Sequence, residues 1–152
     1  MYRAPAANTD GDSLVFFRHS EVISAGDIFS TVSYPIIDVS KGGSIQGVID
    51  GLNTVLDLAV AEYRGQGGTW VIQGRGRLSD TADVASYRNM VTMIRDRVRD
   101  SKAKGLTLEQ VQAARPTMDF DGRYGSTTGP WTTQMFVEAV YRSLQGPQEK
   151  KK

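Results

Sequence analysis

With 152 residues, 39% of them apolar, the chain has the length and hydrophobic content of one folded domain. It contains no cysteine, which excludes disulfide frameworks, thiolate zinc sites and cysteine nucleophiles. The net charge is +1 and the basic residues are scattered, so nothing indicates a nucleic-acid polymer as partner. No run approaches the roughly 20 apolar residues that span a bilayer, so we expect a soluble, cytoplasmic protein without a membrane partner.

The first half of the chain predicts a loop and a hairpin. Residues 1–11 have a turn composition and are expected to form an N-terminal loop. Residues 14–17 and 22–25 are apolar runs joined by a polar turn, which is typical of an antiparallel hairpin. The first run does not alternate, which favours a strand that is covered on both faces. Gly26 and Asp27 follow, and they are expected to present a carboxylate just past a strand end.

Helices and one further strand are predicted after the hairpin. Residues 45–64 carry apolar residues at helical spacing, and Ser44 before them is a good N-cap. Residues 69–72 predict a strand, and Gln73-Gly74-Arg75-Gly76-Arg77 is the loop at its end. Asp80 is the expected cap of a long helix that extends to about residue 103.

The remaining residues predict two more helices. Thr107 and Gln110 form a capping-box pattern for a short helix. Residues 119–129 are polar and predict a loop, and a last helix follows Trp131. Residues 145–152 are expected to form a disordered tail.

The fold class follows from the faces of these elements. The strands are apolar on both sides, whereas the helices can cover only one side of a sheet comfortably. We therefore expect an α/β fold of the α+β type, in which residues 12–144 form a single domain with a mixed sheet and helices on one face. The other face needs a partner.

Four segments of the sequence occur in an order that resembles a known family. They are NTDGDSLVFFRHSEVISAGDIF, SYPIIDVSKGGSIQGVIDGLNTVLDL, GGTWVIQGRGRLSD and YRNMVTMIRDRV. Over about residues 8–144, they resemble the C-terminal half of a metallo-β-lactamase-fold hydrolase. The resemblance implies one half of an αβ/βα sandwich. Two copies packed sheet to sheet would complete such a sandwich, so we expect a homodimer.

The family's metal ligands are only partly matched. Its members carry an HxHxDH motif, a later His before the TDGD-like strand, a Gly-Asp whose carboxylate bridges two metals, and a Gly-His-Gly loop. Asp27 matches the bridging Asp, whereas Asn8 and Arg75 stand at the two later histidine positions, and the sequence contains no HxHxDH motif. Because a guanidinium offers only donors, Arg75 cannot bind a metal. The family's ordinary binuclear site therefore cannot be built from one copy of this chain.

Four residues are candidates for a different metal site. Asp27 is the first, and Asp10, Asp12 and His19 are its possible helpers, His19 across a dimer. An oxygen-rich set of this kind suits a divalent metal such as zinc or manganese. Each residue also has a structural interpretation: Asp27 caps a local turn, Asp10 and Asp12 are turn and strand-start residues, and His19 is an exposed turn residue.

Arg75 is the candidate for binding an anionic substrate. It lies between two glycines, and a guanidinium recognises phosphate or carboxylate through two parallel hydrogen bonds. The positive charges of Arg77 and Lys41 can strengthen the attraction of the same anionic substrate. The alternative is a surface loop that has simply lost its ligand.

Two functions are consistent with these residues. The first is a homodimeric, metal-assisted hydrolase of small anionic esters, with phosphodiesters as the first substrate class and Asp27 and Arg75 as catalytic residues. The second is a catalytically silent, truncated half-domain that serves as a structural or interaction module.

Overall fold

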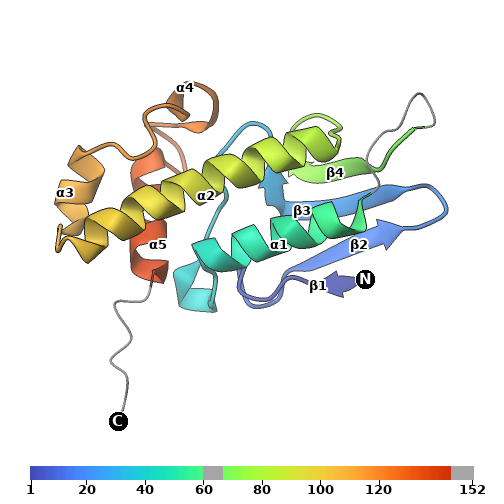
Figure 1. The fold of residues 1–152 in the computed structure, drawn as a ribbon, viewed down its shortest axis with the longest axis horizontal. Helices are drawn as coiled ribbons and strands as arrows, with labels where there is room; N and C mark the ends of the chain where they lie inside the picture. Colours follow the sequence, from blue (N-terminus) through green and yellow to red (C-terminus); the bar gives the residue numbers. More distant parts are fainter. Residues whose placement is uncertain (60–66, 145–152) are drawn as a thin grey trace, which may run out of the picture.

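The computed structural model describes residues 1–59 and 67–144, and within them a mixed sheet carries helices on one side (Figure 1). The sheet has the strand order β1 (Tyr2–Arg3), β2 (Ser13–Phe17), β3 (Val22–Ser30) and β4 (Trp70–Arg75). Strand β2 is antiparallel to both β1 and β3, whereas β4 is parallel to β3. The predictions for residues 60–66 and 145–152 lie outside the described residues.

Two long helices cover the sheet, and the shorter ones lie beyond its end. Helices α1 (Ile45–Leu58) and α2 (Thr81–Ala103) lie side by side over one face (Figure 1). Beyond the carboxyl end of β3 are α3 (Leu108–Ala113), α4 (Asp121–Tyr124) and α5 (Thr133–Ser143). A single 3-10 turn, η1 (Val39–Lys41), precedes α1.

Local capping explains where the long helices begin. The Ser44 hydroxyl accepts a hydrogen bond from the Gly47 N–H at 2.9 Å at the start of α1. At the start of α2, the Asp80 carboxylate accepts from the Asp83 N–H at 2.9 Å, and the Asp83 carboxylate accepts from the Asp80 N–H. Both caps were expected from the sequence, and the expected start of α2 is confirmed.

Several elements differ from the predictions at their ends. Residues 1–11 contain the short strand β1, and Ala4 and Ala7 in this segment are buried. Strand β3 continues through Asp27 to Ser30 because irregularities in its pairing with β4 let it bend without ending. Strand β4 continues to Arg75, which sequence patterning places in a loop.

The two faces of the sheet have different environments. The face under α1 and α2 is buried, with Ile23 and Val71 at 0% exposure. The opposite face leaves Phe17, Trp70 and Ile72 exposed. A mixed sheet with helices on one face is thus confirmed, and it corresponds to half of an αβ/βα sandwich. A partner over the other face stays a prediction.

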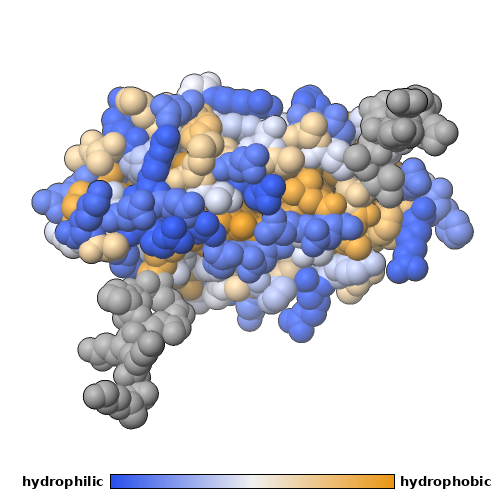
Figure 2. All heavy atoms as spheres, in the orientation of Figure 1, coloured by the Kyte–Doolittle hydropathy of each residue, from blue (hydrophilic) through white to orange (hydrophobic). Residues whose placement is uncertain are grey.

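The helix-bearing side has a mostly hydrophilic surface. Figure 2 shows charged and polar side chains over α1 and α2, with a band of apolar residues between the two helices. Among the helices of residues 1–59 and 67–144, none is long and apolar enough to cross a membrane.

Candidate functional site

Asp27 and Arg75 line one small hollow at the edge where β3 and β4 end. Because these strands are parallel, their carboxyl ends meet at the same edge of the sheet, and Arg75 pairs with Ser30 there. The hollow has a volume of about 10 Å³, and its remaining wall comes from β3 and the segment that follows it, with Phe29, Ser30, Ser33, Tyr34 and Ile36 as lining residues. That volume accommodates roughly one water or one anion oxygen.

The Asp27 carboxylate lies in space left free by a glycine. A Cβ on Gly74 would overlap Asp27 Oδ1, so glycine at 74 allows the carboxylate to lie over β4. Along β4 the exposed side chains of Trp70 and Ile72 alternate with buried ones, and Gly74 continues the exposed set. The Asp27 carboxylate therefore lies on the uncovered side of the sheet, where it is open to solvent.

Arg75 has a fixed backbone and a free guanidinium. The Ser30 hydroxyl donates to the Arg75 carbonyl at 3.4 Å. Next to it, the buried Gln73 amide donates to the Thr31 hydroxyl at 3.0 Å and to the Arg77 carbonyl, which holds the following turn. The Arg75 guanidinium itself forms no ion pair with the part of the chain that the structure describes.

Tyr34 forms a wall of the hollow that sequence patterning did not single out. Its hydroxyl lies 2.9 Å from Asp121 Oδ1 and 3.2 Å from the Thr117 carbonyl oxygen, and its ring stacks on Phe136 at 4.6 Å. Burial, followed by the hydrogen bond to Asp121, raises the pKa of Tyr34 well above its ordinary value. The wall is therefore a neutral ring that is anchored to the C-terminal helices.

Three of the other candidates have local partners away from this edge. Asp12 accepts a hydrogen bond from the Thr9 N–H at 2.6 Å, which agrees with its structural interpretation as a turn residue. The Asp10 N–H donates to the Lys41 carbonyl at 3.0 Å, and the Lys41 ammonium forms an ion pair with Asp38 at 3.2 Å. The β1–β2 loop and η1 thus contact each other.

Arg77 and His19 are also separate from the hollow. Arg77 forms an ion pair with Asp83 at 2.6 Å and donates to the Leu78 carbonyl at 3.0 Å, which ties it to the first turn of α2. His19 is exposed in the turn before β3, and at about 3.3 Å per residue the strand separates it from Asp27 by more than about 17 Å. Within one chain, then, His19 and Asp27 lie apart.

These positions do not fit a metal ion held by one chain. Within residues 1–59 and 67–144, no group of three or more His, Cys, Asp or Glu residues is arranged to hold a metal. A zinc or manganese site needs at least about three protein ligands, and the expected set of Asp10, Asp12, Asp27 and His19 is not brought together. Of the candidates, the structure places Asp27 and Arg75 at the same hollow.

A wider hollow of about 800 Å³ lies between α3, α4 and the start of α5. Its charged lining residues are Arg115 and Asp121, which form an ion pair at 3.6 Å. Because the two charges offset each other, the lining favours neither an anion nor a cation. Sequence patterning gave no signal for this hollow, since its walls come from segments predicted separately as a short helix, a polar loop and the last helix.

A comparison with one solved structure supports the fold. No protein-family model matches the sequence, and no curated protein matches it. One similar solved structure is the sec-alkylsulfatase Pisa1 from Pseudomonas sp., with a TM-score of 0.62 and 14% identity over 92% of this chain and 23% of that chain. Another is VMB-1, with a TM-score of 0.43 and 12% identity over 59% of this chain and 38% of that chain. The chain spans well under half the length of either protein.

Proposed function

We propose that this chain is a half-sandwich that binds a small oxyanion at the edge formed by Asp27 and Arg75. The observation that carries this proposal is a guanidinium without an ion pair in the described residues, beside a hollow of one-oxygen size. Arginine recognises phosphate and related anions with parallel N–H groups. The fold similarity to an enzyme named for alkyl sulfates, which are anionic esters, supports the same ligand class.

Asp27 adds a selectivity to this site. A carboxylate repels a fully ionised oxyanion, but it accepts a hydrogen bond from an oxyanion that still carries a proton. Inorganic phosphate carries at least one proton at neutral pH, and phosphate monoesters carry one below their second pKa of about 6, whereas sulfate and its esters carry none. The site should therefore prefer phosphate over sulfate, and Asp27→Asn should reduce that preference.

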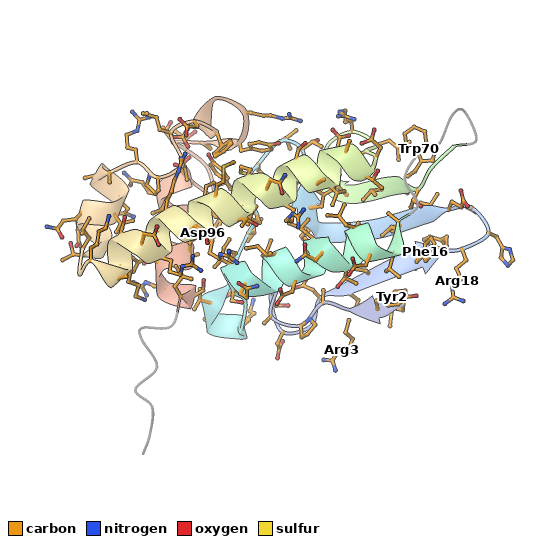
Figure 3. The ribbon with its side chains drawn as sticks, in the orientation of Figure 1. Tyr2, Arg3, Phe16, Arg18, Trp70 and Asp96 are labelled. Carbon is orange, nitrogen blue, oxygen red and sulfur yellow. The ribbon has the colours of Figure 1, made fainter. Side chains whose placement is uncertain are left out.

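A titration with inorganic phosphate, followed by amide NMR shifts at constant ionic strength, tests the proposal. Loss of charge-assisted hydrogen bonds in Arg75→Gln should weaken binding by about 10-fold to 100-fold, because such bonds contribute about 1.5 to 3 kcal/mol. Arg99→Gln is the matched control, because Arg99 is exposed on α2, on the helix-bearing side of the sheet, where it forms an ion pair with Asp96 at 3.1 Å (Figure 3). Equal effects of the two variants, or no effect of either, would rule the site out.

The second candidate function is a metal-assisted hydrolase of small anionic esters, with phosphodiesters as the first class, that acts as a homodimer. The observation in its favour is the exposed Asp27 carboxylate on the uncovered side of the sheet, where a second polypeptide can contribute further ligands. In this alternative Asp27 helps to hold the metal and Arg75 stabilises charge on the substrate.

Hydrolysis of bis(p-nitrophenyl) phosphate separates the two candidates. A rate that is lost on chelation and also in Asp27→Ala supports the hydrolase. A rate that neither treatment changes eliminates it, and phosphate binding that persists in the presence of the chelator then favours the oxyanion-binding half-sandwich.

A further inference from the structure

The uncovered side of the sheet is an ordered apolar surface, which we call the open sheet face. In its first row Phe17 pairs with Val22, and Val22 pairs with Trp70. Directly paired residues point to the same side of a sheet, so each row lies on one face. The second row is made by Val15, Ser24 and Ile72 in the same way. Phe17, Trp70 and Ile72 are 52%, 51% and 46% exposed.

The apolar area of this surface is large enough to indicate a protein interface but small for a high-affinity complex. Aromatic side chains bury about 150 to 250 Å² each, so half-exposed Phe17 and Trp70 together with Ile72 offer roughly 300 Å². Patches of a few hundred Å² mark interaction sites, and a stable complex buries about 800 Å² on each partner. With the backbone and edge residues around it, the open sheet face suits a dissociation constant in the micromolar range.

Charge favours a second copy of this chain as the occupant. The two rows contain no ionisable side chain, so the face selects neither an acidic nor a basic partner. The net charge of +1 means that two copies barely repel each other. Arg18 and Glu21 lie at the turn end of the face, and the Asp27 carboxylate lies on the same face at its other end. A two-fold arrangement whose axis runs across the strands therefore brings Arg18 of each copy toward the Asp27 carboxylate of the other.

We propose that the open sheet face is the interface of a two-fold homodimer whose axis runs across the strands. The rows are centred on Ile23, and the β2–β3 turn and Asp27 lie a similar number of residues to either side of it. Rotation about this axis places the turn of one copy over the Asp27–Arg75 edge of the other, at the sheet spacing of about 10 Å. This arrangement adds His19 of the partner subunit to the proposed anion site at Asp27 and Arg75. The role of His19 there rests on the proposed function.

Sedimentation velocity from about 1 to about 200 µM tests the dimer. Wild-type protein should pass from monomer to dimer over this range. Ile72→Glu introduces an unpaired charge into the face and should weaken association at least about 10-fold. Met118→Glu is the matched control, because Met118 is an exposed methionine in the connection between α3 and α4, and it should associate as wild type does. Circular dichroism verifies that each variant is folded.

Tryptophan fluorescence gives a second readout that introduces no charge into the interface. The chain has two tryptophans, so Trp131→Phe leaves Trp70 as the single reporter. Its emission should shift to the red on dilution as the dimer dissociates. A chain that stays monomeric with constant emission overturns the proposal and leaves the face to a different polypeptide. Dimers that form equally well with Ile72→Glu and Met118→Glu overturn it too.

The phosphate titration distinguishes failure of the dimer from failure of the anion site. A monomer that binds phosphate through Arg75 would retain the proposed function without the dimer. In a dimer, His19→Ala should leave association unchanged and weaken phosphate binding, because it removes a hydrogen-bond donor from the anion site of the partner. Phosphate binding that is the same with and without His19 would overturn the proposed direction of the two-fold axis.

Discussion

Tyr34→Phe measures how strongly the wall of the Asp27–Arg75 hollow is anchored to the C-terminal helices. The substitution keeps the ring and its stacking on Phe136, but it removes the hydroxyl that lies 2.9 Å from Asp121 Oδ1. A hydrogen bond to a charged acceptor contributes about 1.5 to 3 kcal/mol, and the buried Thr117 carbonyl also loses a partner. We expect a loss of about 2 kcal/mol in the free energy of unfolding.

The assay is urea unfolding followed by circular dichroism, with thermal unfolding beside it. For a chain of this length, about 2 kcal/mol corresponds to a melting temperature lowered by about 4 to 8 °C. Tyr124→Phe is the control, because Tyr124 belongs to the same ring cluster, with its centroid 5.9 Å from that of Tyr34, and no hydrogen bond of its hydroxyl occurs within residues 1–59 and 67–144. Equal losses of stability in both variants, or a loss of less than about 0.5 kcal/mol in Tyr34→Phe, would contradict an anchoring role of the hydroxyl.

Two further predictions concern the frame that carries the site. Asp80→Ala removes the cap of α2 and should cost about 1 kcal/mol by urea unfolding, whereas Asp57→Ala on the exposed side of α1 should change stability by less than about 0.5 kcal/mol. Gly47→Ala places a methyl group against the backbone of Ala6 and should cost about 1 to 3 kcal/mol. Gly122→Ala meets no neighbouring atom and should not destabilise the protein, so a similar loss there would contradict the packing argument.

Elements encoded by adjacent residues were predictable from the sequence. The start of α2 follows from Asp80 and the residues next to it, and α3 from the capping box of Thr107 and Gln110. The hairpin of β2 and β3 follows from two apolar runs and the polar turn between them. In these cases the hydrogen bonds that fix the element join residues only a few positions apart, so the local pattern contains the information.

Features that depend on distant partners were not predictable. Strand β3 continues through Asp27 because it pairs in parallel with β4, which comes after helix α1 in the chain. The residues around Asp27 show no local alternation that would indicate this pairing. The hydrogen bond between Tyr34 and Asp121 spans 87 positions. The sequence singled out Asp27 and Arg75 separately, and the parallel pairing of their strands explains why they share one hollow.

The positions of Asp12 and His19, which were proposed to bind a metal together with Asp27, could not be predicted from the sequence either. The Asp12 carboxylate accepts a hydrogen bond from the Thr9 N–H, so it serves its own loop and not the edge where β3 ends. His19 belongs to the same hairpin as Asp27, yet the length of β3 keeps the two apart within one chain. Residue type made these side chains candidates, whereas their directions depend on the fold around them.

Anomalous diffraction from crystals soaked in tungstate, a heavy analogue of phosphate, tests most directly whether Asp27 and Arg75 bind an oxyanion. The same experiment shows whether the residues of one chain hold a metal ion at Asp27. We expect a tungsten peak within hydrogen-bonding distance of the Arg75 guanidinium and no zinc or manganese peak at Asp27 in the same crystals. A zinc or manganese peak coordinated by Asp27 and other residues of the same chain, or tungsten bound elsewhere with the Arg75 edge empty, would contradict this expectation.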